Sequence, residues 1–263
     1  MEIGPILRAM IRNKLGAVLI TLQIAFTMTV VINAIFIINE RSNLMARPSG
    51  LDEANTFYLS SVGYGDEFNG VVTVRDDLER LRQTPGVVDA TVTNAIPVSG
   101  SGSNTGVRLV DDEAAATSFA AYYRVDEHAI ETMDLDLVAG RNFAAEDVQW
   151  RAGSEAITTR ELIISQQLAN NLFPDREPNG VLGETMFING SEAYQIIGVV
   201  EQLQGPWPSN SSVELSMLQP NSSVGSSATY LIRTEPGQRD RLMAEVEEML
   251  VASNSNRIIR DLM

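Results

Sequence analysis

The longest apolar run of the chain lies near its N-terminus, at residues 15–39, which read LGAVLITLQIAFTMTVVINAIFIIN. No charged residue interrupts this run between Lys14 and Glu40. As a helix it extends roughly 37 Å at about 1.5 Å per residue, whereas the hydrocarbon core of a bilayer is about 30 Å thick. We therefore predict that residues 15–39 form a transmembrane helix.

Two other interpretations of this run are less favourable. A cleaved signal peptide usually has an apolar region of only about 7–15 residues, and no small-x-small cleavage site follows the run here. A core helix of a soluble domain seldom stays apolar on all its faces. Gln23 and Asn33 lie about 80° apart around such a helix, so we expect them to face other helices rather than lipid.

The flanks of the run predict its orientation. Arg8, Arg12 and Lys14 precede it, and the other flank opens with one acid and one base. Because basic residues favour the cytoplasmic side, we expect a cytoplasmic amphipathic segment at residues 1–14 and the bulk of the chain on the extracytoplasmic, or periplasmic, side of the cell inner membrane.

Beyond a polar stalk at residues 40–54, apolar periodicity predicts two strand–helix–strand units, one at residues 55–98 and one at residues 227–263. In the first, residues 87–98 alternate. We expect one face to carry Val88, Ala90, Val92, Asn94 and Ile96 and the other to carry Asp89, Thr91 and Thr93. The predicted helices have apolar positions three or four residues apart, namely Leu78 and Leu81 in the first unit and Leu242, Val246 and Leu250 in the second.

The intervening residues 99–226 differ from both units, because short apolar runs separated by Gly, Pro and Asn predict mostly strands. Asn189–Gly190 between two such runs predicts a hairpin. The Ser- and Asn-rich residues 208–227 are expected to be a mobile loop. The whole pattern predicts an α+β fold: one N-terminal transmembrane helix, then a split, porter-like subdomain with a mostly β subdomain inserted into it.

The net charge of −15 is unevenly distributed. Excluding Glu2 leaves 33 of 34 acids, and excluding Arg8, Arg12 and Lys14 leaves 16 of 19 bases, so residues from 40 onward carry about −17. Because nucleic-acid binding depends on basic residues that neutralise phosphates, we expect no nucleic-acid partner.

No catalytic, cofactor-binding or metal-binding residue is predicted. The only lysine is Lys14, which Leu15 follows, so the chain has no Gly-Lys-Ser/Thr phosphate loop. It has no cysteine, and its only histidine, His128, is expected to be a structural or surface residue. The acidic clusters Asp76–Asp77 and 111–113 lack the alternating ligands of a calcium loop and are expected to be solvated.

The order of these parts resembles that of the MacB-type ABC transporter permeases of the FtsX superfamily. No single motif decides this resemblance, but five segments follow one another in the expected order over nearly the whole chain. They are RAMIRNKLGAVLITLQIAF at 8–26, LRQTPGVVDATVTNAIPVSG at 81–100, LVAGRNFAAED at 137–147, LIISQQLANNLFPDREPNGVLGETM at 162–186 and YQIIGVVEQL at 194–203.

The resemblance implies a permease subunit that pairs with a separate ATP-binding subunit, forms a homo- or heterodimer, and contacts a periplasmic adaptor. It implies export of a peptide, drug or lipid-linked cargo, with residues 1–14 close to the ATPase. Family members have three further spans after the outer domain, so we expect this chain, which stops at Met263, to be a fragment.

Two other functions remain open at this stage. A single-span sensor or receptor with an extracytoplasmic ligand domain would have the same arrangement of parts. A membrane-anchored hydrolase would need a nucleophile constellation, and only His128 could serve as its base.

Overall fold

The computed structural model describes residues 14–45, 49–112, 114–153, 155–188, 192–208 and 212–262. The chain divides into two compact units, Met1–Arg47 and Pro48–Met263. The predicted amphipathic segment, apart from Lys14, and the Asn189–Gly190 turn lie outside the described residues.

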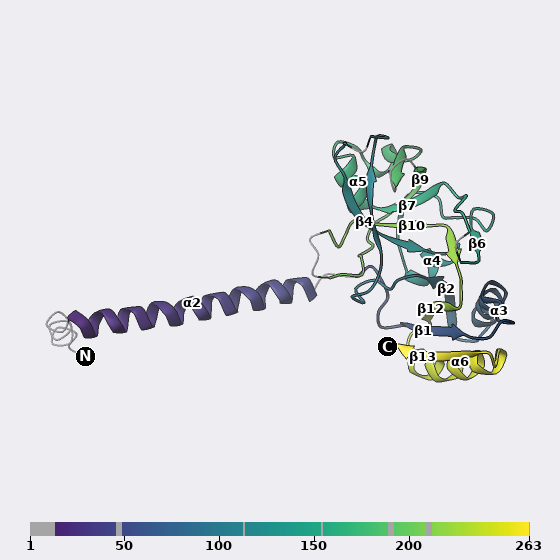
Figure 1. Cartoon of the computed structure of the whole chain (residues 1–263), viewed down its shortest axis with the longest axis horizontal. Helices are drawn as coiled ribbons and strands as arrows, with labels where there is room; N and C mark the ends of the chain where they lie inside the picture. The colour runs from purple at the N-terminus through teal and green to yellow at the C-terminus, as the bar shows by residue number, and fades with distance from the viewer. Residues whose placement is uncertain are drawn as a thin grey trace. The chain divides into compact units, whose positions relative to one another are not determined.

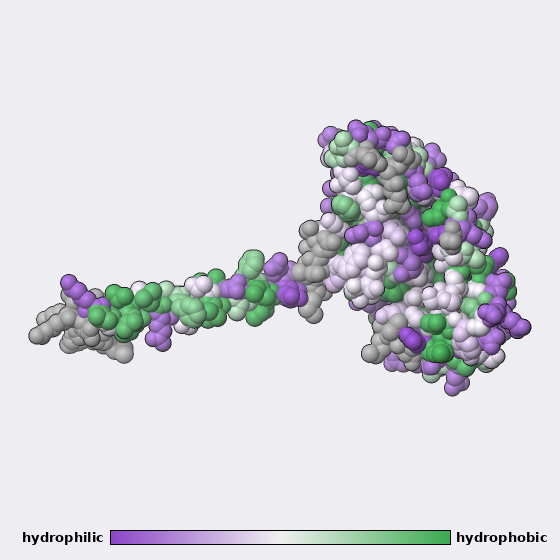
Figure 2. Space-filling model, viewed as in Figure 1, coloured by the Kyte–Doolittle hydropathy of each residue, from purple (hydrophilic) through white to green (hydrophobic). Residues whose placement is uncertain are grey.

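The first unit contains one long helix, α2 (Lys14–Met45), which includes the whole predicted span and continues into the predicted stalk. Its large apolar side chains are exposed, with Leu15 at 75% and Phe26 at 73%, and Figure 2 shows them along the rod. By length and composition α2 can cross a membrane. The hydroxyls of Thr21, Thr27 and Thr29 each donate a hydrogen bond to the carbonyl four residues earlier, as groups surrounded by lipid must find partners within the helix.

A four-stranded antiparallel sheet is assembled from both ends of the second unit, in the order β13-β1-β12-β2. Each strand–helix–strand unit is split, because its two strands are separated by a strand of the other unit. This arrangement confirms the predicted split α+β organisation. The elements are β1 (Thr56–Gly63), α3 (Gly70–Arg82) and β2 (Val87–Thr93) from the first half, and β12 (Ser227–Thr234), α6 (Arg239–Ser253) and β13 (Arg257–Leu262) from the second.

Helices α3 and α6 pack on one face of this sheet (Figure 1). The predicted apolar positions fill the layer between them: Leu78, Leu81, Leu242, Val246 and Leu250 are all at most 1% exposed and share one core with residues of β1, β2 and β12. Asn69 caps α3 by accepting a hydrogen bond from the amide of Val72, which satisfies an otherwise unpaired N–H group.

The inserted residues form a seven-stranded sheet in the order β5-β9-β7-β10-β4-β3-β8. Because β8 pairs with β9 as well as with β3, the sheet closes on itself around its own apolar core. Its strands are β3 (Asn104–Arg108), β4 (Ser118–Arg124), β5 (Leu137–Gly140), β7 (Glu161–Ser165), β8 (Thr185–Ile188), β9 (Glu192–Val200) and β10 (Ser216–Gln219).

Short elements complete the insertion. Strands β6 (Gln149–Arg151) and β11 (Asn221–Ser223) form a separate parallel pair. The helical turns are α4 (Ala129–Met133), α5 (Gln166–Leu172) and the 3-10 turn η1 (Pro178–Val181). Strands β8 and β9 pair antiparallel, which confirms the predicted hairpin partners.

A third apolar core joins the two sheets. It includes Leu231 of β12, Tyr123 of β4, Ile163 of β7 and Met133 of α4. Both faces of the four-stranded sheet are therefore covered, one by helices and one by the insertion. For this reason the alternation predicted for β2 is wrong: Asp89, Thr91 and Thr93 are buried as well as Ala90 and Val92, and Val88 is exposed.

The Ser- and Asn-rich segment predicted to be a mobile loop is the second error. Strand β10 lies between β7 and β4, and all four of its residues are buried. Asn221 and Ser222 of β11 are also buried. Polar composition was misleading here because these side chains lie in the interior, at the junction of the two sheets.

Candidate functional site: the junction between the two sheets

A buried carboxylate joins the four-stranded sheet to the insertion. Asp126 follows β4 and is 0% exposed. Arg82 of α3 donates to its Oδ2 at 2.7 Å, and Thr91 of β2 donates to its Oδ1 at 2.6 Å. Burial raises the pKa of Asp126, whereas Arg82 and Thr91 act in the opposite direction. Removing Arg82 would leave the carboxylate of Asp126 buried without a counter-charge, which is costly.

His128, the N-cap residue that precedes α4, extends this cluster. Its Nδ1 lies 2.9 Å from Oδ2 of Asp89, a residue of β2 whose other oxygen is 3.4 Å from Nε of Arg82. The hydrogen bond to Asp89 raises the pKa of His128, while burial and Arg82 lower it. His128 thus links the insertion to β2.

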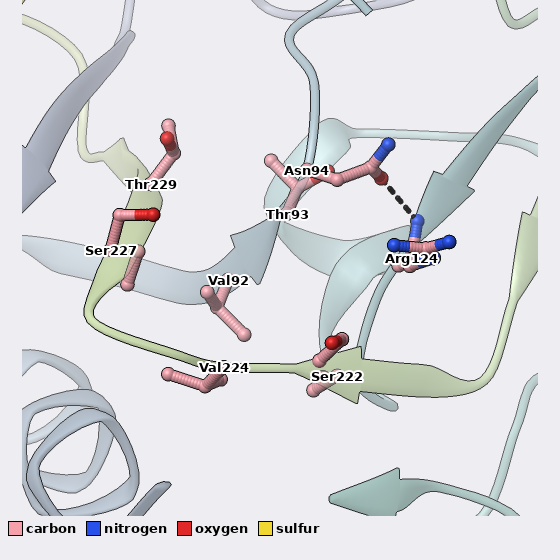
Figure 3. A pocket seen from close by; sticks show the side chains of 10 residues that line it. Val92, Thr93, Asn94, Arg124, Ser222, Val224, Ser227 and Thr229 are labelled. Carbon is pink, nitrogen blue, oxygen red and sulfur yellow. Dashed lines mark hydrogen bonds between the residues drawn. The ribbon is translucent and has the colours of Figure 1, made fainter. Parts of the chain in front are cut away.

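Next to this cluster lies a cleft of about 220 Å³ between the two sheets. Figure 3 shows Asn94, Arg124 and Ser222 along one side of it and Ser227 and Thr229 along the other. Thr93, Ser223, Val92, Val224 and Ala228 complete its lining. The lining has one charged side chain, Arg124, and no carboxylate, so the cleft is a potential binding site for an acceptor-rich group.

Arg124 is positioned by its backbone and by an aromatic ring. Its amide donates to Oδ1 of Asn94 at 2.6 Å, and its guanidinium lies 5.2 Å from the centre of the Tyr122 ring. Within the described part of the chain its Nε–H is buried and has no hydrogen-bond partner, and the same holds for the hydroxyl of Ser222.

A second buried ion pair lies within the four-stranded half. Asp77 of α3 is 1% exposed. Its carboxylate accepts hydrogen bonds from the guanidinium of Arg257 in β13, from the hydroxyl of Tyr230 at 2.6 Å and from that of Ser253 at 3.2 Å. Burial and Asp77 together raise the pKa of Tyr230. The prediction that both Asp76 and Asp77 are solvated is therefore wrong for Asp77, which fastens α3 to the C-terminal strand.

The sequence did not predict that Arg82, Asp126 and Arg124 lie at the junction of the two sheets. A signal was present: Asp126 follows the stretch FAAYYRV, in which Arg124 is the one charged residue, and a buried charge is unusual unless it is paired. Its partners could not be identified, because Arg82 lies 44 positions away along the chain. Among the described residues no group of three or more acidic or histidine side chains is arranged to hold a metal ion.

These features define a class of protein. A helix of membrane-spanning length precedes an α+β unit in which a closed β sheet is inserted into a split sheet. This arrangement fits a membrane-anchored protein in which a folded α+β domain follows one apolar helix.

Comparisons with known proteins identify the family. The family model of the MacB-like periplasmic core domain matches residues 16–249. This chain therefore belongs to the family of MacB-like periplasmic core domains, found in ABC transporter permeases. A comparison with curated proteins finds no match.

Similar solved structures include three of this kind. The periplasmic region of MacB from Actinobacillus actinomycetemcomitans has 16% identity and a TM-score of 0.49, with 83% of this chain and 94% of that chain covered. The extracellular domain of the ABC-type transporter YknZ from Gram-positive bacteria has 16% identity, a TM-score of 0.47, and coverages of 79% and 100%. A permease domain from Porphyromonas gingivalis has 18% identity, a TM-score of 0.45, and coverages of 82% and 93%.

Proposed function

We propose that this chain is part of a MacB-like permease subunit that couples ATP hydrolysis by a separate subunit to movement of its extracytoplasmic domain. The cargo is an exported peptide, drug or lipid-linked molecule. The match to the MacB-like periplasmic core domain over residues 16–249 is the observation that carries this proposal.

Two further features support the proposal. The basic residues before α2 favour a cytoplasmic N-terminus, which brings residues 1–14 to the side where ATP is available. The chain has no Gly-Lys-Ser/Thr sequence, so hydrolysis is assigned to a partner. We further propose that the subunit works as a homo- or heterodimer and contacts a periplasmic adaptor.

Movement of the outer domain would pass through the junction of the two sheets. The apolar core that both sheets share, and the ties from Asp126 to α3 and β2, make the second unit respond as one body. In this proposal the domain transmits displacement and has no chemical step of its own, in keeping with a non-enzymatic role.

Co-purification tests the proposal. Full-length tagged protein would be extracted from its native membranes in mild detergent, and the associated proteins identified by mass spectrometry. We expect a protein with a phosphate-binding loop to co-purify, and expect the variant R8Q/R12Q to retain less of it. If no ATP-hydrolysing protein associates, even after cross-linking in the membrane, the proposal fails.

The second candidate is a single-span sensor. The cleft beside Arg124 favours it, because a sensor needs a ligand site in its outer domain. A sensor would co-purify with a signalling partner in place of an ATPase, so the same experiment separates the two functions.

A further inference from the structure

Two residues that line the cleft at the junction carry buried hydrogen-bond donors that have no partner among the described residues. Ser222 is 2% exposed, yet its hydroxyl has no partner among the described residues, and the same is true of the Nε–H of Arg124. An unpaired polar group in the interior costs free energy. A ligand that accepts hydrogen bonds from both groups would remove this cost.

The charges around the cleft favour an anion. Arg151 of β6 is a second cation in this region, and its register partner in β11 is Ser223. Burial and the charge of Arg124 lower the pKa of Arg151, whereas Glu155 acts in the opposite direction. No carboxylate lines the cleft. This contrasts with the acidity of the chain from residue 40 onward, which carries 33 acids and 16 bases.

Arg124 also differs from Arg82 and Arg233, two other arginines near the junction. Arg82 is bound to Asp126, and Arg233 of β12 lies 2.7 Å from Asp134. Arg124 has no carboxylate partner among the described residues. A guanidinium presents several donors in a planar fork, which suits the oxygens of phosphate and carboxylate groups.

Size limits the ligand. The cleft measures about 220 Å³, below the roughly 300–1,000 Å³ of sites for drug-sized ligands and several times the about 30 Å³ that one water occupies in the liquid. It can hold a polyatomic anion or the charged end of a larger molecule.

We propose that the cleft between β2, β12, β4 and β11 binds a phosphate-type oxyanion, which accepts hydrogen bonds from Arg124 and Ser222. The oxyanion is either a free ion or the phosphate of an ester. Such a ligand would contact both sheets at once and stabilise their arrangement. This inference does not depend on the proposed transport function.

The test is a titration of the full-length protein in a neutral detergent, at constant ionic strength, with inorganic phosphate in one series and glycerol 3-phosphate in another. Binding would be followed by calorimetry and by the midpoint of thermal unfolding. The variants are R124Q, S222A and, as a matched control, R141Q, which removes an exposed arginine paired with Asp147 and Glu161.

We expect saturable binding of at least one probe by the wild type and by R141Q. We expect the dissociation constant to rise about tenfold or more in R124Q and severalfold in S222A, the usual size of a lost charged or neutral hydrogen bond. Tighter binding of glycerol 3-phosphate would identify an ester as the ligand, and tighter binding of phosphate a free ion. Absence of saturable binding by the wild type, or unchanged affinity in both R124Q and S222A, would overturn the proposal.

Discussion

For Asp77, the sequence contained a signal of burial but none of its partner. Residues 74, 77, 78 and 81 of α3 are all buried, so Asp77 lies on the apolar stripe of its helix. This spacing could have indicated a buried, paired carboxylate. The partner could not be found in the same way, because Arg257 lies 180 positions further along the chain.

We predict that Asp77→Ala destabilises the protein by about 3–5 kcal/mol, because it leaves the guanidinium of Arg257 buried without a counter-charge. Urea denaturation would measure this change. The control is Glu245→Ala, which breaks the exposed pair with Arg241 and should cost at most about 0.5 kcal/mol. Similar losses in both variants would show that the Asp77 pair is not buried.

His128 predicts a pH dependence of stability. Folding raises the pKa of His128, chiefly through the hydrogen bond to Asp89 and also through the charge of Asp126, whereas burial and Arg82 lower it. A carboxylate oxygen of Glu127 lies 3.9 Å from Nε2 of His128. A raised pKa means that the stabilising contribution is complete below the unfolded pKa of about 6.5. The contribution is lost as the pH rises through the folded value.

We therefore expect the free energy of unfolding of the wild type to fall between pH 6 and pH 8 relative to that of His128→Gln. Denaturation at a series of pH values checks this, and the difference between the two proteins cancels the titration of the other groups. Parallel pH profiles would contradict the role of His128.

At the scale of elements, pattern predicted most of what local sequence determines. The apolar spacing of α3 and α6 and the hairpin partners β8 and β9 are all present. Strand β10 was missed because its environment is tertiary: it lies between β7 and β4, which are far from it in sequence, and two of its four residues are polar. The cleft was missed for the same reason, since its lining comes from four strands.

Gly140 at the end of β5 gives a prediction about an element. Its φ is +78°, and an added Cβ would collide with the backbone of Ile197 and Gly198 in β9. Gly237 has the same φ of +78°, but a Cβ there would meet nothing within 4 Å. Comparing alanine substitutions at the two glycines therefore separates the cost of backbone strain from the cost of close packing.

We expect Gly237→Ala to cost about 1–2 kcal/mol, the usual cost of a left-handed conformation for a residue with a Cβ. Gly140→Ala should cost more, because β5 must also move away from β9. Thermal unfolding of both variants would measure the two costs. Equal losses would show that β5 and β9 do not approach each other so closely.

At the scale of the whole molecule, the order of parts along the chain carried more information than any single motif. A long apolar helix, two split strand–helix–strand units and a β insertion were sufficient to predict the fold class, and the family match over residues 16–249 agrees with it. The cleft at the junction was not predictable, because it depends on contacts between residues that are far apart in the sequence.

Orientation in the membrane is the prediction that belongs to this scale, and the absence of cysteine makes it directly testable. Asn13→Cys introduces a thiol before α2, and Ser101→Cys places one at an exposed position of the second unit. Neither variant has a second thiol within residues 1–263. A membrane-impermeant maleimide would be added to right-side-out and to inverted vesicles from the same cells.

If the basic flank lies in the cytoplasm, as positive residues favour, S101C reacts in right-side-out vesicles and N13C reacts only in inverted ones. Labelling after detergent solubilisation shows that both thiols can react. The opposite pattern would place the acidic bulk of the chain on the cytoplasmic side, where a domain that transmits motion to the outside could not act. The orientation therefore decides whether the proposed coupling is physically possible.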